Sequence, residues 1–472
     1  MTGWWVKKLL APVDAASLAV FRIVFAATMF ALALFYYSSP RFSIYAEEAF
    51  RFRYYGFEWV PVWSSDARTL LVYVLGASAL LLLAGFCYRI AAIAVALCHL
   101  SLALMDIRFY QNHMYLLAII SILMVVIPAH RAFSVDASLR VSRHGPYVPA
   151  WCVWILRIQF ALVYFWAGVA KLQADWLLGV PLRIFADRSE HANFITGEFA
   201  ILGMSYAGLL FDLLVGPALL WRKTRLPAYC VSLLFHLINY HLWGIDVFPH
   251  FMMGATLVFF APDWPRAVIA RVLRRSHAPC EPVQAAPQDR RRFGSLQIAF
   301  FTVFVLWQGL MPLRPYFYPG AVHWNEEGQL YAWRMMSVSK RCVARFHAYD
   351  PHTKRRWELE PRDFNVELYT LAGWLPEIQP VWNAVQFARH AANVLRDRGL
   401  DRVEIYADLF VSINRRKPEL LIDPAIDLAS VEYGFMPVAW IRDLREPLPR
   451  SNAERDAASR DWVSKGGNYW AW

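Results

Sequence analysis

The fold is decided by an apolar run at residues 151–171, WCVWILRIQFALVYFWAGVAK. Arg157 is the only charged residue in this run before Lys171 ends it. A helix rises about 1.5 Å per residue, so about 20 residues cross the roughly 30 Å hydrocarbon core of a bilayer. The run therefore predicts a membrane-spanning helix with an arginine inside it and a lysine at its end.

Eight further apolar runs predict that the chain crosses the membrane about nine times. They lie at about 15–37, 69–87, 90–107, 113–129, 201–221, 226–243, 247–262 and 294–312. The first run follows Lys7 and Lys8 and lacks a small-residue cleavage site, so we expect a retained span and not a signal peptide. Residues 1–312 are therefore predicted to form a mostly α, polytopic membrane helix bundle.

The composition of the 472-residue chain agrees with this prediction. Hydrophobic residues make up 58% of the chain and charged residues 18%, against about 25% charged in soluble domains. The net charge of +11 could indicate nucleic-acid binding, but the basic residues fall in loops between apolar runs, so we expect a membrane and no nucleic acid as partner. No CxxC, zinc-finger or HExxH spacing is present, so no metal site is predicted.

After residue 312 the pattern changes to that of a folded α+β domain, residues 313–472. Apolar residues alternate with period two in VEIYADLFVSI (403–413), which predicts a strand. A hairpin is expected around Asp350 and Pro351. Residues 381–398 show helical spacing that stops before Gly399, so a helix is predicted there.

Two polar residues at membrane depth are candidates for chemistry, because polar groups are costly there. Lys171 shares a helix face with Tyr164, and its aromatic surroundings would favour the neutral amine that acts as a base. His113 begins another span, after Asn112, at the same predicted membrane face, so the two form a candidate acid–base pair. The alternatives are a lysine that extends to the interface and pairs with Asp175, and a histidine that only begins a helix.

Other polar residues in the spans have structural interpretations as well. Arg157 and Asp212 are predicted at similar depth in neighbouring spans, so we expect a structural ion pair. His236 and His241 are five residues apart and do not share a helix face, so they predict no metal pair. His236 and Asn239 either line a polar cavity or pack in the core.

Seven motifs resemble, in order, the signatures of the vitamin K-dependent gamma-carboxylases. They are PVDAASLAVFRI (12–23), NHMYLLAIISILMVVIPAHRAFSVDA (112–137), FWAGVAKLQADWLLG (165–179), FHLINYHLWGIDVFPHFM (235–252), HWNEEGQLYAWRMM (323–336), VSIN (411–414) and LLIDPAIDL (420–428). The resemblance runs from about residue 11 to about residue 445, which is nearly the whole chain.

The resemblance implies a membrane enzyme that couples two reactions. Reduced vitamin K, a naphthohydroquinone taken from the bilayer, reacts with O2 and ends as the 2,3-epoxide. The strong base formed on the way removes a γ-proton from a peptidyl glutamate, which then adds CO2. No metal is implied.

The resemblance also implies roles for single residues. Lys171 matches the catalytic lysine of the family, and His113, preceded by Asn112, matches its catalytic histidine region. An outer-domain motif of the family is associated with the quinone and the glutamate. The expected cofactor-binding residues, from this motif and from the polar positions above, are Trp324, Trp333, Met335, Met336, His236 and Asn239.

Two positions depart from the vertebrate pattern. Vertebrate members have Ser before the second tryptophan of the outer-domain motif and His five residues after it, where this chain has Ala332 and Val338. The Arg- and Ala-rich chain, which lacks a long C-terminal extension, is expected to be bacterial. Carboxylation of peptidyl glutamate is the first hypothesis. The alternatives are quinol epoxidation without protein carboxylation, and a non-catalytic membrane protein that binds quinones or lipids.

The basic residues predict the orientation of the chain. With a cytoplasmic N-terminus, the inner segments carry 16 Lys and Arg residues and the outer loops before residue 312 carry 7, as the positive-inside rule requires. We expect a multi-pass protein of the cell (inner) membrane with residues 313–472 extracytoplasmic. Alkaline phosphatase fused after Trp472 should therefore be active. A fluorescent reporter that matures only in the cytoplasm should be dark at the same place, and the reverse pattern would refute this orientation.

Overall fold

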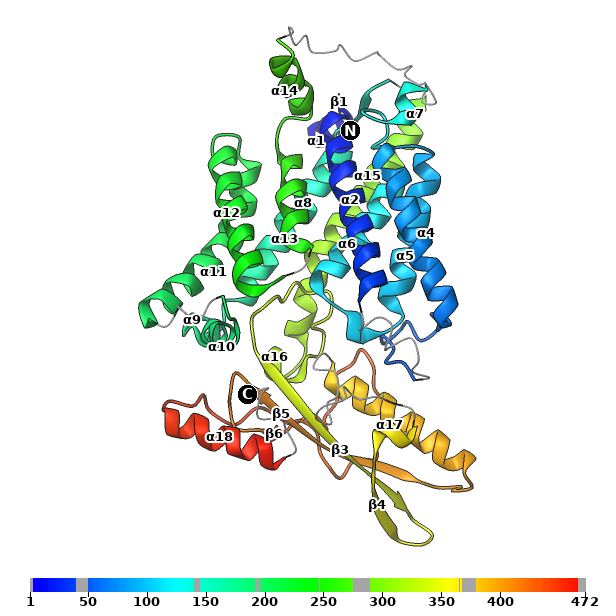
Figure 1. Cartoon of the computed structure of the whole chain (residues 1–472), viewed down its shortest axis with the longest axis vertical. Helices are drawn as coiled ribbons and strands as arrows, with labels where there is room; N and C mark the ends of the chain where they lie inside the picture. Colours follow the sequence, from blue (N-terminus) through cyan, green and yellow to red (C-terminus); the bar gives the residue numbers. More distant parts are fainter. Residues whose placement is uncertain are drawn as a thin grey trace.

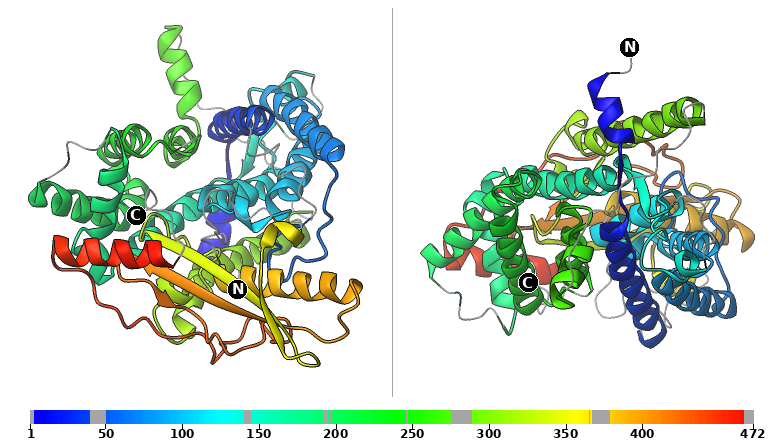
Figure 2. Two further views of the ribbon diagram at one scale, coloured as in Figure 1. Left: turned by 60° about the horizontal axis from the view of Figure 1, so that its bottom comes forward. Right: turned by 90° about the horizontal axis from the view of Figure 1, so that it is seen from above.

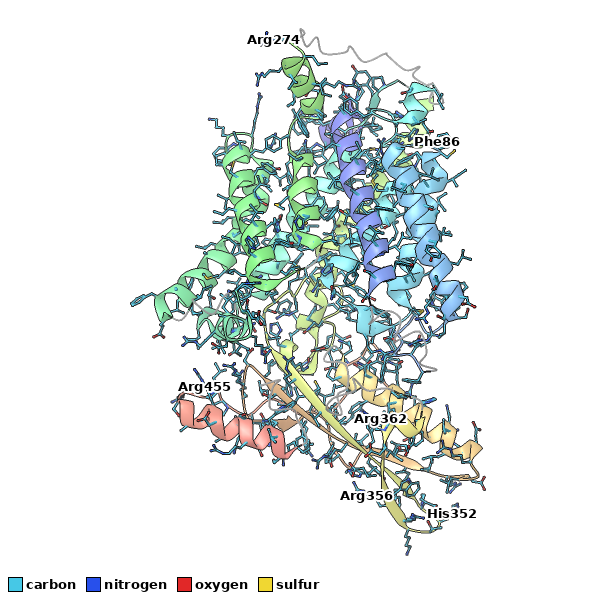
Figure 3. The ribbon with its side chains drawn as sticks, viewed as in Figure 1. Phe86, Arg274, His352, Arg356, Arg362 and Arg455 are labelled. Atoms are coloured by element: carbon cyan, nitrogen blue, oxygen red, sulfur yellow. The ribbon has the colours of Figure 1, made fainter. Side chains whose placement is uncertain are left out.

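The computed structural model describes residues 3–39, 50–139, 145–191, 195, 197–245, 247–274, 289–364, 366 and 379–465. A bundle of long helices forms one end of the molecule and a smaller sheet-containing domain forms the other (Figure 1). Arg274 lies at the far end of the bundle and His352 at the tip of the sheet domain (Figure 3). Segments predicted to lie inside and outside thus occupy opposite ends, and which end faces the cytoplasm stays a prediction.

A helix overlaps each of the nine segments predicted to span the membrane. These helices are α2 (Ala16–Ser38), α4 (Ser65–Ala84), α5 (Tyr88–Leu104), α6 (Asn112–Val126), α8 (Trp151–Ala170), α11 (Glu198–Leu220), α12 (Arg225–Trp243), α13 (Phe248–Ala255) with the 3-10 turn η2 (Thr256–Phe259), and α15 (Asp289–Leu310). Five stretches of the described chain are long and apolar enough to cross a membrane, namely α2, α4, α8, α11 and Gly294–Phe317. The chain is a multi-pass membrane protein, and the number of nine spans stays a prediction.

Short elements fill the connections of the bundle. They are α1 (Trp4–Leu10), η1 (Ile107–Phe109), α7 (Val135–Ser138), α9 (Ala174–Leu177), α10 (Val180–Arg188), α14 (Trp264–Val272), η3 (Met311–Phe317) and α16 (Val322–Asn325). A small antiparallel sheet pairs β1 (Pro12–Asp14) with β2 (Tyr147–Pro149) and so joins the starts of α2 and α8.

The sheet domain has the strands and the helix that the sequence predicts. Its antiparallel sheet has the order β4-β3-β5-β6, built from β3 (Lys340–Asp350), β4 (Arg355–Leu359), β5 (Glu404–Ile413) and β6 (Glu419–Leu420). β3 and β4 form the predicted hairpin, and the apolar residues of β5 from Ile405 to Ile413 are buried. The helix α17 (Pro380–Asp397) packs on the sheet, with the rings of Phe346 and Phe387 4.4 Å apart. A second helix, α18 (Asn452–Ser464), lies at the opposite end of the domain from α17 (Figures 1 and 2).

Two buried arginines of the bundle bind backbone carbonyls. Arg157 donates from Nε to the carbonyl of Val258 at 2.9 Å and from Nη2 to that of Phe260 at 2.7 Å. The predicted ion pair between Arg157 and Asp212 is therefore wrong. The physical reason is that the short turn η2 ends at Phe259 and leaves carbonyl groups without helical donors, and such groups need a partner inside a membrane bundle. Arg22 binds the carbonyls of the loop after α6 in the same way.

Glycines allow α8 and α11 to approach closely. A Cβ atom on Gly168 would lie 2.8 Å from the Leu213 side chain and 2.9 Å from its backbone nitrogen. On Gly216 it would lie 3.2 Å from the Cα and carbonyl oxygen of Ala161. Small residues at a crossing let two membrane helices pack backbone to backbone. The two helices therefore keep a fixed rotation and register relative to each other.

Polar contacts connect the bundle with the sheet domain just after α8. The carboxylate of Asp175 accepts hydrogen bonds from both terminal nitrogens of Arg416, at 2.7 and 3.0 Å. Gln173 donates to the carbonyl of Ser337 at 2.7 Å, and Arg188 donates to the Ser339 hydroxyl at 3.1 Å. These contacts hold the segment before β3 and the turn after β5 against the end of the bundle.

Gly168→Ala tests the close approach of α8 and α11. The added methyl group would overlap Leu213, and overpacking of this kind costs about 1–3 kcal/mol. Thermal unfolding of the purified protein in detergent should therefore shift to lower temperature. Gly203→Ala is the matched control, because Gly203 lies in α11 with no atom within 4 Å of the added group. Equal unfolding temperatures of the two variants would contradict the packing argument.

Candidate active site

A cavity of about 640 Å³ lies where the bundle meets residues 334–336 of the segment before β3. Its wall is formed mainly by apolar and aromatic side chains of α8, α11, α12 and α13. Most residues predicted from the sequence meet here, although they come from distant parts of the chain. Those that line the cavity are Lys171, His113, Asn112, His236, Asn239, Met335 and Met336.

Lys171 forms a buried ion pair across the junction of α8 and α11. It caps the C-terminal end of α8, and its Nζ donates to Asp212 Oδ2 at 2.6 Å and to the carbonyl of Ala167 at 3.3 Å. Lys171 is 7% exposed and Asp212 4%. The alternative partner Asp175 binds Arg416 instead. Lys171 is thus a lysine of the cavity wall and does not extend to solvent.

The aromatic residue Trp176 completes the surroundings of this amine. The Lys171 Nζ lies 5.1 Å from the centre of the Trp176 ring, within the range of a cation–π contact. The Trp176 indole donates to the carbonyl of Ser205 in α11 at 3.0 Å, which fixes the ring. The amine therefore has one carboxylate, one carbonyl and one aromatic face as neighbours.

His113 lies in the first turn of α6 and faces the same cavity. Its ring stacks on Phe248 with 5.6 Å between ring centres. Its Nε2 atom is buried and has no hydrogen-bond partner among the residues that the structure describes. Asn112 donates to the carbonyl of Arg334 at 3.3 Å, which links the start of α6 to the sheet domain. His113 therefore presents a ring nitrogen free to bind or move a proton.

His236 and Asn239 both line the cavity, as one of the two sequence interpretations expects. His236 Nε2 is 2.8 Å from the hydroxyl of Tyr164, so α12 and α8 are joined at the cavity wall. Asn239 donates to the carbonyl of Phe235 in its own helix at 2.9 Å.

The four residues of the outer-domain motif separate into two groups. Met335 and Met336 line the cavity. Trp333 is buried and packs against Tyr115 with 4.8 Å between ring centres, and Trp324 lies in the core of the sheet domain, where its indole donates to the carbonyl of Arg442 at 2.6 Å. Neither tryptophan lines the cavity, which differs from the expectation that both contact the cofactor.

The backbone of this motif explains the separation. Tyr331, Trp333 and Met336 have positive φ angles of 68°, 56° and 48°, a region that costs energy for residues with a side chain. At each of these three residues the positive φ angle changes the direction of the chain, so neighbouring side chains point in different directions. The tryptophan is thereby placed in the core and the two methionines at the cavity, a difference that no sequence periodicity predicts.

Sequence reasoning missed two charged residues of the cavity. The sequence predicts an ion pair of Asp212 with Arg157, because the depth of a residue in a span can be read from the sequence. Which helix the residue faces cannot be read from it. Arg334 follows Trp333 in the motif and lines the cavity as well. No group of three or more His, Cys, Asp and Glu side chains in the described part of the chain could hold a metal ion.

Comparisons with known proteins agree with this architecture. Residues 10–264 match the family model described as the HTTM domain. Residues 294–447 match the family model described as the lumenal domain of vitamin K-dependent gamma-carboxylase. No solved structure matches the chain significantly. The multi-pass helix bundle and the lumenal domain together show that the chain belongs to the vitamin K-dependent gamma-carboxylase family.

Proposed function

We propose that the chain is a membrane-embedded gamma-glutamyl carboxylase that uses vitamin K hydroquinone. It would couple oxygenation of the quinol to the 2,3-epoxide with carboxylation of a peptidyl glutamate by CO2. The observation that carries the proposal is the single cavity that holds the ion pair of Lys171 and Asp212 beside His113 in apolar surroundings. The cell membrane, with the N-terminus in the cytoplasm, is the proposed location.

The cavity suits a naphthoquinone in size and lining. Ligand pockets commonly measure about 300–1,000 Å³ and are mostly apolar with a few polar groups. Aromatic rings of α11, α12 and α13 form much of the wall, including Phe211, Phe235 and Phe248. The rings of Phe211 and Phe235 stack on each other with 3.8 Å between their centres, so this part of the wall is aromatic. We propose that this wall holds the quinol, with Met335 and Met336 on the side of the sheet domain.

Bound there, the quinol would supply together with O2 the strong base that abstracts the γ-proton of glutamate. The chain's own part is to accept the quinol proton and to exclude water. Lys171 Nζ and Asp212 Oδ2 lie 2.6 Å apart, and we propose that a proton moves from Nζ to Oδ2 before the quinol reacts. With the proton on Oδ2 the amine is neutral and able to accept another, and an apolar site disfavours the separated charges. Asp212 would thus let a paired lysine act as a base.

His113 would be the second proton-handling group. His113 lines the cavity, and its buried Nε2 has no partner in the described ranges, so we propose that this atom donates to or accepts from a bound quinol oxygen. Its stacking on Phe248 holds the ring plane in one orientation. Asn112 supports the same turn from the side of the sheet domain.

Quinol epoxidation without carboxylation is the second candidate, because of Ala332 and Val338. Ala332 is buried at 3% exposure, and Val338 packs against the core of the sheet domain. Neither lines the cavity, so these departures from the vertebrate pattern leave its wall unchanged. This favours the carboxylase over the epoxidase alternative. A membrane protein that only binds quinones or lipids would need no ion pair at the wall.

One assay separates the three functions. The purified protein is incubated with vitamin K hydroquinone, O2, labelled bicarbonate and a Glu-containing peptide, and epoxide and peptide-bound label are measured separately. The carboxylase gives both products, the epoxidase gives epoxide alone and the binding protein gives neither. Absence of label in the presence of epoxide would refute the carboxylase.

Lys171→Arg tests the base directly. Arginine keeps the positive charge opposite Asp212, but it stays protonated and cannot accept the quinol proton. Loss of a general base typically lowers the rate about 10²–10⁴-fold, and we expect epoxide formation to fall by this factor. The double variant Lys171→Met with Asp212→Asn removes both charges together and should be equally inactive without leaving a buried carboxylate unpaired.

Lys340→Arg is the matched control for this prediction. Lys340 also forms a buried ion pair, with Glu326 at 3.0 Å, but it lies in the sheet domain and does not line the cavity. Its substitution should leave epoxide formation within a few-fold of the wild-type rate. Near wild-type activity of Lys171→Arg would overturn the assignment of the base and favour the binding protein.

A further inference from the structure

Arg334 is a charged side chain of the cavity wall for which the proposed function has no role. It lies in the segment from Tyr331 to Met336, in which three residues have positive φ angles. Its own carbonyl accepts a hydrogen bond from Asn112 at the start of α6. The backbone of Arg334 is thus tied to the bundle one residue before His113.

Among the described residues, the guanidinium of Arg334 contacts two neutral side chains. Nη2 lies 2.5 Å from His323 Nε2, and Nη1 donates to the hydroxyl of Tyr316 at 3.3 Å. Burial, together with the charges of Arg334 and Lys340, holds the pKa of His323 well below its usual value, so this histidine is a neutral acceptor. No carboxylate in the described residues forms an ion pair with Arg334.

Donor capacity remains on this guanidinium. An arginine has five N–H groups in a planar fork, and only one contact is formed at each Nη atom. The Nε atom is buried and has no partner among the described residues. Arg334 is half-buried, and a partly desolvated cation gains from a counter-ion. A carboxylate matches the fork with two parallel hydrogen bonds. The site is therefore complementary to a planar anion.

The two cationic residues of the cavity wall differ in this respect. Lys171 is neutralised by Asp212 at 2.6 Å. Arg334 has no such carboxylate among the described residues, so it is the cation of this wall that is free to pair with a ligand. The quinol enters the cavity uncharged and becomes an anion only after it gives its proton to the pair of Lys171 and Asp212. The substrate that already carries a negative charge when it enters is the glutamyl acceptor, through its side-chain carboxylate.

We propose that Arg334 binds the γ-carboxylate of the glutamyl acceptor as a bidentate ion pair. The inference rests on the proposed function and assigns the acceptor side of its cavity. When the γ C–H bond breaks, the proton goes to the base and the electron pair delocalises onto the carboxylate oxygens. A fixed guanidinium at these oxygens stabilises the additional negative charge where it develops. Arg334 would thus select a side chain with a carboxylate and favour the loss of the proton from its γ-carbon.

Peptide binding to the full-length protein in detergent tests the proposal without turnover. The probes are two blocked tripeptides, acetyl-Leu-Glu-Leu-amide and its Gln counterpart, followed by tryptophan fluorescence at neutral pH. Hydrogen bonds to charged groups contribute enough that the wild type should prefer Glu over Gln by about 10–100-fold. Arg334→Gln should abolish the preference. Arg334→Lys should retain part of it, because lysine keeps the charge and loses the fork.

Arg345→Gln is the matched control. It removes the same charge from an exposed position of β3, away from the cavity, and should leave the preference unchanged. Equal binding of the two peptides by the wild type would overturn the proposal even if Arg334→Gln did not fold. Undiminished preference in folded Arg334→Gln would overturn it too, and so would competition by inorganic phosphate as strong as that by the Glu peptide.

The outcome for the proposed function is separate. In the assay with quinol and labelled bicarbonate, folded Arg334→Gln is supplied with increasing concentrations of the Glu peptide. Its KM for the Glu peptide should rise about 10–100-fold. A wild type that prefers the Glu peptide but fixes no label would refute the carboxylase and leave the carboxylate site standing.

Discussion

The ion pair between Lys171 and Asp212 is the interaction on which the rest of the site depends. It forms because a charge in an apolar bundle must find its partner inside the protein. The partner is within reach because Gly168 and Gly216 let α8 and α11 pack backbone to backbone. The same requirement governs Arg157, which takes carbonyls freed by the end of η2. Polar groups of the bundle thus fix which helix faces which.

The cavity is a property of both domains together. The bundle supplies Lys171, Asp212 and His113, and the sheet domain supplies Arg334 and the two methionines that follow it. Their mutual position is held by polar contacts on both sides of the cavity, from Asn112 on one side and Asp175 on the other. A change in the docking of the sheet domain would therefore change the wall of the site.

This arrangement suits a reaction with one substrate from lipid and one from water. The aromatic wall between α11, α12 and α13 is built from helices of the bundle, whereas Arg334 comes from the segment before β3 in the lumenal domain. In the proposed function, the amine at the end of α8 lies between the two and can serve the quinol while the guanidinium holds the peptide. In this proposal the quinol has Lys171, which is neutralised by Asp212, as its polar contact. The peptide has Arg334 as its own.

The main helices and strands of this protein can be predicted from its amino-acid pattern. Length and apolarity predicted the helices of the bundle, alternation predicted β5, and a Pro-containing turn predicted the hairpin of β3 and β4. It also singled out Lys171 and His113, because polar residues are conspicuous in apolar runs. Which polar residues pair with each other depends on how the helices pack in three dimensions. Periodicity gives the face of a helix on which a residue lies, but the rotation of one helix against another depends on side-chain packing. Asp212 therefore faces Lys171 and not Arg157. The positive φ angles of Tyr331, Trp333 and Met336, which no sequence pattern predicts, place Arg334 at the cavity.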